Sequence, residues 1–416
     1  MRILGDYELA SGQKINLSKS SVSFEKSSSV ESHQKVLPVL GMREVVDQGK
    51  YLGLPLHIGW SKREVFRYIT EKVDSRLKGW RGKLLSQSGK EIMIKSVTSA
   101  IPIFIMNCFK LPVGIIDSLN SSMAKFYWGN ADGFRGIYWK VWDKLCDDKF
   151  EGALSFKDLE CMNLALLAKQ GRGGGGQVIT RQASLLFKVL KGKYFRQSTF
   201  LRAKLWANPS FGWRSLLEGH KVLSKGIRWR VGDGRSINMW TEPWVPRNTD
   251  FFLRGEQGDK PRWVSELMQG GVWNKREVER VVEGDDVRRI LSIPINQRGL
   301  HDRPIWSHTK CGNYLTSSGY KCARNLQKGD ELRGKALGEN NNNESISWVW
   351  KQVWKLHIPP RVKKFVWRLW LSTSLTLRTI RGPWHSFREW WELLHDHKHE
   401  QGCIEALIQV ACTRVY

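Results

Sequence analysis

The sequence has few features of a membrane or secreted protein. Its longest apolar run, residues 101–109, is interrupted by Pro102 and Asn107 and falls well short of the roughly 20 residues that span a bilayer. No apolar segment of a secretory signal follows Met1. The seven cysteines include no Cys-x-x-Cys pair, which disfavours a disulfide framework and favours a reducing, intracellular compartment.

Acidic residues are scarce relative to basic ones. The 416 residues contain 67 Lys and Arg against 40 Asp and Glu, which gives a formal net charge of +27. Such an excess attracts polyanions, and nucleic acid or an anionic membrane surface would both satisfy it. Apolar residues form 41% of the chain, which excludes a wholly disordered protein and allows two or three domains.

Tryptophan is unusually abundant, with 21 residues. Its ring suits aromatic cores, base stacking and cation–π contacts with arginine. For the series Trp80, Trp128, Trp139 and Trp142, packing in a core is the favoured interpretation over base stacking.

Residues 61–128 have helical periodicity. Ser61 and Glu64 form a capping box, and apolar residues then recur at spacings of three and four up to Trp80. A second capping box, from Ser88 to Glu91, predicts another helix. A third is predicted to end near Gly129.

The most basic stretch, residues 177–247, holds fourteen Lys and Arg against three Asp and Glu, a net charge of +11. Inside it, Trp229 and Val231 would share one face of a strand, with Arg228 and Arg230 on the other. The turn sequence Asp233-Gly234 then predicts a β-hairpin with a basic face. A basic amphipathic helix is expected after Pro359-Pro360.

Other short elements and breaks are indicated between these regions. A helix is expected to end near Gly12, and alternating patterns predict short strands at residues 15–19, 21–24 and 51–56. The glycine-rich residues 171–176 and the polar residues 327–345 are interpreted as linkers.

Many collinear segments resemble the open reading frames of plant LINE-type, non-LTR retroelements. The matching segments are Tyr7 through Ser20, Tyr51 through Leu56, Leu77 through Trp80, Leu84 through Lys95, Lys125 through Gly129, Leu164 through Gln170, Val189 through Phe195, Arg228 through Trp244, Trp354 through Leu356 and Pro359 through Lys363. The resemblance covers nearly the whole chain to about residue 380.

The resemblance implies a C-terminal part of a reverse transcriptase, beginning after the catalytic turn of the palm. Asn16 and Lys19 resemble the fourth palm motif, and Tyr51 to Gly53 resemble the hairpin that grips the primer end. We expect nucleic-acid contacts from nine residues, Lys19, Tyr51, Gly53, Arg228, Arg230, Arg235, Lys363, Lys364 and Arg368.

The family's catalytic turn, aromatic-Ala-Asp-Asp, does not precede Tyr7. Its aspartates would hold two Mg²⁺ ions for nucleotidyl transfer. The pair Asp147-Asp148 is interpreted as a solvated loop, and Asp285-Asp286 as a helix start or loop cluster. No catalytic residue is therefore assigned.

This sequence also matches only part of the family's zinc-binding region. The resemblance implies a Cys-x-x-Cys followed by a His/Cys pair, but the match ends near Ile380. The remaining candidates are His395, His397, His399, Cys403 and Cys412, and a polar helix end is favoured over a weak zinc site. We therefore assign no metal ligand and no cofactor, although the family implies Mg and Zn.

These observations predict an α+β fold with short β-hairpins, a thumb-like helical bundle, a mixed connector and a small α-rich C-terminal region. The expected domains are a palm-edge and primer-grip remnant at 1–58, thumb-like helices at 59–170, a basic Trp-rich connector at 171–326, a linker at 327–345 and a truncated zinc-binding-like region at 346–416.

The leading functional hypothesis is a retroelement-derived fragment that binds RNA or DNA non-specifically without catalysis. A second hypothesis is part of a reverse transcriptase that is active when a longer product or another chain supplies the palm. A third is a non-functional, partly folded gene product.

We expect an intracellular protein of the nucleus or cytoplasm with no membrane partner, and leave its oligomeric state open.

Overall fold

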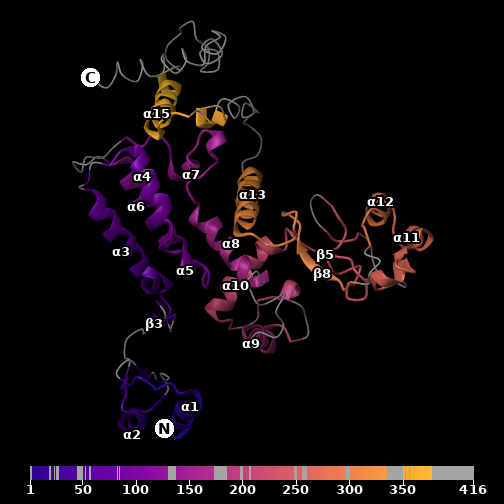
Figure 1. Ribbon diagram of the computed structural model, residues 1–416, viewed down its shortest axis with the longest axis horizontal. Helices are drawn as coiled ribbons and strands as arrows, with labels where there is room; N and C mark the ends of the chain where they lie inside the picture. The colour runs from indigo at the N-terminus through magenta and orange to yellow at the C-terminus, as the bar shows by residue number, and fades with distance from the viewer. Residues whose placement is uncertain are drawn as a thin grey trace. The chain divides into compact units, whose positions relative to one another are not determined.

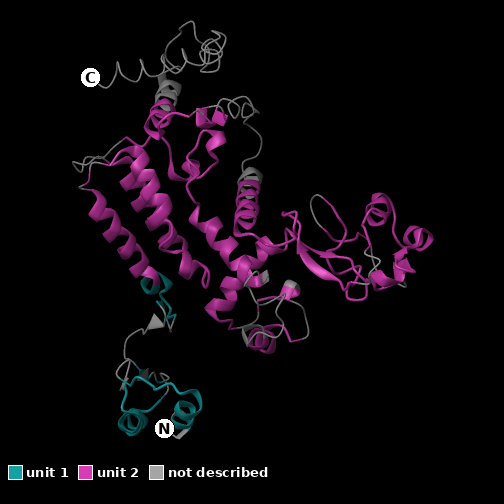
Figure 2. Cartoon of the chain, in the orientation of Figure 1, with its two compact units in different colours: residues 1–65 teal, residues 66–416 magenta. Residues whose placement is uncertain are grey.

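The computed structural model describes residues 2–17, 20–22, 24, 28–44, 50–51, 53–55, 58–81, 83, 85–129, 137–172, 185–196, 200–205, 208–247, 251–254, 260–295, 300–334, 350–351, 353–355 and 357–376. The chain divides into two compact units, Met1–Val65 and Phe66–Tyr416, which Figure 2 colours separately. Both units combine helices with short strands (Figure 1).

The first unit contains several small elements. They are α1 Arg2–Ser11, β1 Ser21–Val22, α2 Val30–Leu40, β2 Arg43–Glu44, β3 Lys50–Tyr51 and β4 Leu54–Pro55. β1 and β2 pair in parallel, whereas β3 and β4 form an antiparallel hairpin. Gly53 turns this hairpin with a φ of 81°, which glycine adopts without strain. The predicted helix end near Gly12 is confirmed. The single strand predicted at residues 51–56 is instead this hairpin, and residues 15–17 are not a strand.

Helices follow over residues 62–128, as the periodicity predicts. They are α3 Lys62–Arg81, α4 Gln87–Met93, the π-helix η1 Ile94–Thr98, α5 Ile103–Met106 and α6 Val113–Trp128. α3 buries Phe66, Ile69, Val73 and Leu77 along one face, each at most 1% exposed. α6 ends before Gly129, as predicted.

The N-terminal cap of α4 differs from the prediction. Ser86, rather than Ser88, accepts a hydrogen bond from the backbone N–H of Gly89 at 3.2 Å. Ser88 lies inside the helix, and Glu91 is buried instead of reaching back to a cap. The Ser-x-x-Glu spacing favoured Ser88 as the cap, but Glu91 pairs with Lys364 instead.

One core of the second unit, which we call the main core, is formed where α8 Leu159–Arg172, α10 Phe211–Leu223 and α13 Thr316–Gly334 pack together. Trp213 of α10 is fully buried and stacks on Tyr194, with ring centroids 4.7 Å apart. Tyr194 closes α9 Leu185–Tyr194. Gly219 lies where α10 approaches the backbone of α8 most closely, since a Cβ there would be 2.5 Å from Ala168 N.

Two segments predicted as linkers overlap the ends of helices. α8 continues through Gly171 and Arg172, and α13 continues to Gly334, so residues 327–334 are helical. Burial explains the first case, since Gly171 lies against Leu223 and Phe200. In the second case, Lys328 of α13 forms an ion pair with Asp147 at 3.2 Å, so the polar C-terminal part of this helix has an acidic partner.

The predicted hairpin with its turn at Asp233-Gly234 is wrong. β5 Ile227–Arg230 pairs antiparallel with the distant β8 Arg303–Trp306, in the register Ile227 to Trp306 and Arg230 to Arg303 (Figure 1). Residues 231–240 do not return alongside β5. They form a loop that leads into a second, smaller core.

The second core gathers short elements around Trp244. They are the 3-10 helix η4 Val264–Leu267, β6 Met268–Gln269, β7 Val272–Trp273, α11 Lys275–Val281 and α12 Asp285–Leu291. β6 and β7 form an antiparallel hairpin turned by Gly270 and Gly271. The pair Asp285-Asp286 begins α12, as predicted.

α15 Pro360–Thr376 follows Pro359 and confirms the expected basic helix. The remaining elements are α7 Trp142–Leu145, η2 Lys149–Glu151 and η3 Phe200–Arg202. In the described part of the chain, helices predominate and strands occur only as two-stranded pairs. The α+β fold class is therefore confirmed.

The close approach at Gly219 predicts a sharp difference between two glycines. Gly219→Ala should destabilise the protein by about 1–3 kcal/mol, because the added methyl group meets backbone atoms that cannot rotate away. Gly192→Ala, in an open position of α9, should be neutral or slightly stabilising. Urea unfolding of both variants tests this, and equal stabilities would contradict the packing of α8 on α10.

Candidate nucleic-acid interface

The paired strands β5 and β8 form a two-faced ribbon. Because side chains alternate along a strand, Ile227, Trp229 and Trp306 share one face. Trp306 belongs to the main core, and Trp229 packs against the second core. The other face carries Arg228 and Arg230. The ribbon thus connects the two cores through one face and presents arginines on the other.

Three arginines, Arg228, Arg230 and Arg303, make up the polar face of this ribbon, which we call the arginine face. Arg230 and Arg303 are exposed and lie directly opposite each other in the register. Like charges in this position repel. No carboxylate of the described residues pairs with any of the three, and partial burial lowers the pKa of Arg228.

Asp302 holds the end of the ribbon. Its Oδ1 accepts hydrogen bonds from the backbone N–H groups of Gly232 at 2.7 Å and Gly234 at 3.0 Å, and its Oδ2 accepts one from Ser236 at 2.9 Å. The acid next to Arg303 is therefore occupied by backbone donors. Its carboxylate shapes the loop and leaves the arginines without an ion pair.

The other predicted contact residues lie in different places. Arg235 is exposed in the loop beside the ribbon. Tyr51 and Gly53 belong to the β3–β4 hairpin of the first unit, where Gly53 is exposed. Lys19 lies outside the described residues. Arg368 is exposed on α15, and Lys363 Nζ donates to the carbonyl oxygen of Trp354 at 2.9 Å.

Lys364 points into the protein rather than toward solvent. Only 4% of the residue is exposed, and its ammonium group pairs with Glu91 of α4. Lys95 and Lys149 approach Glu91 Oε1 at 2.6 and 3.4 Å. Burial opposes ionisation of Glu91, but the neighbouring ammonium groups lower its pKa to about 2. Lys364 therefore anchors α15 on α4, and we leave it out of the proposed binding surface.

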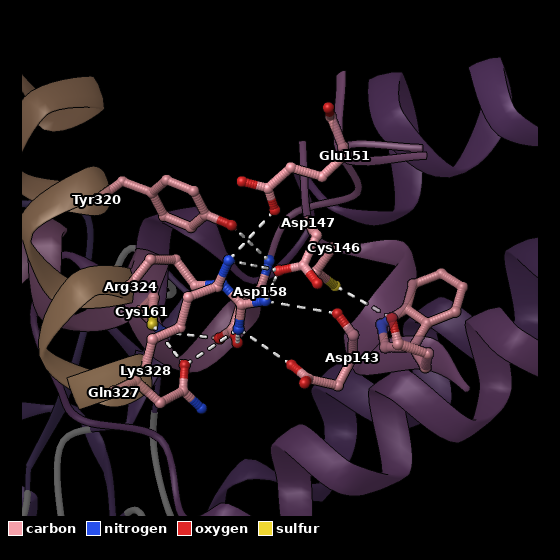
Figure 3. A network of polar contacts seen from close by, with 12 residues as sticks. Asp143, Cys146, Asp147, Glu151, Asp158, Cys161, Tyr320, Arg324, Gln327 and Lys328 are labelled. Atoms are coloured by element: carbon pink, nitrogen blue, oxygen red, sulfur yellow. Dashed lines mark hydrogen bonds and ion pairs between the residues drawn. The ribbon is translucent and has the colours of Figure 1, made fainter. Parts of the chain in front are cut away.

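Arg324 of α13 is the centre of a second buried network (Figure 3). Its guanidinium group donates to Asp143 at 3.0 Å, Asp147 at 2.8 Å and Asp158 at 2.8 Å. Burial alone would lower the pKa of Arg324, but these carboxylates raise it above its ordinary value. The prediction of a solvated Asp147 is wrong, because this side chain is only 14% exposed and fully engaged.

The acidic groups that sequence reasoning considered as metal ligands serve other roles. Asp148 caps η2 by accepting from the N–H of Phe150, and Asp286 pairs with Arg247 and Arg289. Within the described ranges, no three His, Cys, Asp or Glu side chains are arranged to hold a metal ion. His395, His397, His399, Cys403 and Cys412, the zinc candidates, lie outside those ranges.

Arg303 is the residue that sequence reasoning missed. It lies 73 positions beyond Arg230, and no turn sequence links the two strands. Only the alternation of Arg303 with Pro304 and Ile305 before a buried Trp306 hints at a strand there.

None of the described helices is long and apolar enough to cross a bilayer.

The chain is similar to proteins of Arabidopsis thaliana. No family model matches it. It is 27% identical over 318 residues to a "Putative ribonuclease H protein" of Arabidopsis thaliana, covering 73% of this chain and 48% of the relative. The chain thus spans about half the length of that protein.

The chain is also 35% identical over 151 residues to an "Uncharacterized mitochondrial protein" of the same plant, covering 36% of this chain and 96% of the relative. Relatives of these kinds are typical of retroelement-derived sequences.

The Glu91 network predicts a pH-dependent contribution to stability. A carboxyl whose folded pKa is about 2, below its ordinary 4.5, stabilises the fold above pH 4.5 and loses that effect as the pH falls through 2. Glu91→Gln should destabilise the protein by about 3–5 kcal/mol at pH 7, because Lys364 stays buried without its partner. The difference from wild type should shrink below pH 4.5.

Chemical denaturation between pH 2 and pH 8 measures this effect. Glu71→Gln is the matched control, since Glu71 forms an exposed pair with Arg67 and should change stability little. A Glu91→Gln variant as stable as wild type at pH 7 would show that the ion pair does not hold α15.

The Arg324 network predicts a second large effect. Arg324→Met should cost about 3–5 kcal/mol of unfolding free energy, because the buried carboxylate of Asp158 loses its cation and Asp147 keeps only Lys328. Arg288→Met removes an exposed pair with Asp285 and should be close to neutral. Thermal unfolding distinguishes the two variants, and a similar small loss for both would refute the network.

Proposed function

The chain belongs to the family of the Arabidopsis uncharacterized mitochondrial protein, and on this premise we propose that it is a retroelement-derived polypeptide that binds RNA or DNA non-specifically. We further propose that it descends from the part of a LINE-type reverse transcriptase that follows the catalytic palm turn. The collinear segments that resemble that family support this origin. The ribonuclease H name of the longer relative concerns that protein and is not carried over.

The arginine face is the observation that supports nucleic-acid binding most directly. A cation that stabilises a fold is usually paired, as Arg324 and Lys364 are in this protein. Arg228, Arg230 and Arg303 instead gather on one surface, while Asp302, the acid next to Arg303 in sequence, accepts from backbone N–H groups. A phosphate group would relieve the repulsion between Arg230 and Arg303 by accepting hydrogen bonds from both guanidinium groups.

Binding of this kind is electrostatic and independent of sequence. Phosphate contacts position a protein on nucleic acid but carry no base information. The chain's excess of positive charge adds attraction over the length of the polymer. We propose no polymerisation by this chain, because its residues include no aromatic-Ala-Asp-Asp turn.

A salt titration tests the proposal. The logarithm of the affinity for a labelled 20-nucleotide strand should fall linearly with the logarithm of the salt concentration. Each phosphate contact contributes about 0.7 to this slope for a single strand. Arg230→Gln combined with Arg303→Gln should therefore weaken binding and reduce the slope by about 1.4.

Arg288→Gln provides the matched control, because it removes one exposed charge from α12. This variant should retain most of the slope of the logarithm of affinity against the logarithm of salt concentration. Affinity that does not change with salt would overturn the proposed function. A double variant with the wild-type slope would overturn the assignment to the arginine face.

A further inference from the structure

A patch of exposed aromatic and basic side chains lies beside the loop that follows β5. Phe252 and Trp263 expose 43% and 37% of their surface, and Lys260 and Arg262 are also exposed. We call these four residues the aromatic patch. Exposed aromatic rings beside cations combine apolar stacking surface with positive charge.

The backbone brings the members of the patch to one stretch of chain, residues 238–245. Trp263 forms a β-bridge with Asn238. On the far side of this stretch, the N–H groups of Trp244 and Val245 donate to the carbonyl oxygen of Phe251 at 2.7 and 2.9 Å. Trp263 therefore pairs with one end of this segment, and Phe252 follows the residue that is bonded to its other end.

Trp263 is held firmly although its ring is exposed. The N–H groups of Arg262 and Trp263 donate to Glu266 Oε1 at 3.3 and 2.9 Å, and the N–H of Met239 donates to Arg262 O at 3.0 Å. A ring on a fixed backbone loses little conformational entropy when a ligand stacks on it. Such pre-organisation is expected of a binding platform.

The cations of the patch have aromatic neighbours rather than acidic ones. The guanidinium group of Arg262 lies 5.2 Å from the centre of the Trp263 ring, and Lys260 Nζ lies 5.6 Å from that of Trp240. Glu266 is occupied by backbone donors, and neither cation forms an ion pair with a described residue. The patch thus offers flat surfaces and positive charge together.

The patch and the arginine face are connected by short backbone contacts. Ser236 donates to Asp302, the residue before Arg303, and the N–H of Ser265 donates to Gly234 O at 3.0 Å. The loop of residues 231–240 therefore joins the end of the ribbon to the segment that carries Trp263. A strand of nucleic acid passing over the arginines would reach the patch along this loop.

We propose that the aromatic patch stacks unpaired nucleobases, so that the protein prefers single-stranded RNA or DNA over a duplex. This inference rests on the proposed function, since the arginine face supplies the phosphate contacts. Indole rings and guanidinium planes are the groups on which splayed bases stack, whatever their sequence. The bases of a duplex are stacked on one another and cannot reach the patch.

The experiment measures the affinity of the full chain for three labelled 20-nucleotide probes by fluorescence anisotropy. The probes are a thymidine strand, a strand of equal charge that lacks bases, and a duplex. We expect the thymidine strand to bind most tightly. Trp263→Ala should weaken its binding by about 5- to 150-fold, the range for the loss of one stacked base, and leave the other two probes unchanged.

Three further variants separate the loss of stacking from misfolding and from a general effect of removing an exposed ring. Trp263→Phe should retain most of the affinity, and Phe252→Ala should show a loss of the same kind if Trp263→Ala fails to fold. Trp60→Ala removes a ring that is 97% exposed in the first unit and should change nothing. A baseless strand bound as tightly as the thymidine strand overturns the inference while leaving the proposed function intact. Absence of salt-sensitive binding to every probe overturns the proposed function itself.

Discussion

The pairing of β5 with β8 is the interaction on which the candidate interface depends. It joins two strands that are 73 positions apart at Arg230 and Arg303, and it is completed by Asp302, which accepts three backbone hydrogen bonds. Without this carboxylate the N–H groups of Gly232 and Gly234 would lose their partners. The same pairing places Trp306 in one core and Trp229 against the other, so the packing of both cores fixes the arginines.

The basic residues discussed above form two groups, which differ in whether a carboxylate pairs with them. Where a carboxylate is buried, it collects cations and holds elements together, as Glu91 does for α4 and α15 and as Asp158 does for α8 and α13. Where carboxylates are occupied by backbone N–H groups, as Asp302 and Glu266 are, the neighbouring arginines form no ion pair with a described residue.

Local patterns predicted most helices and the fold class but not the long-range pairing. The periodicity around Phe66 and the stop at Gly129 are set by neighbours in sequence, which is why these helices were predicted correctly. The Asp233-Gly234 turn suggested a hairpin because turn chemistry is local, whereas the partner of β5 is chosen by the burial of Trp306. Nor does the sequence reveal that Lys364 is buried while Arg230 is exposed.

The most direct test of the central claim maps where a nucleic-acid strand lies on the protein. A photoreactive 20-nucleotide thymidine strand can be crosslinked to the full chain, and the modified peptides identified by mass spectrometry. The account predicts crosslinks in residues 228–240, 260–263 and 301–306, which bear the arginine face and the aromatic patch. Crosslinks confined to α11 and α12, with none in those three segments, would contradict it.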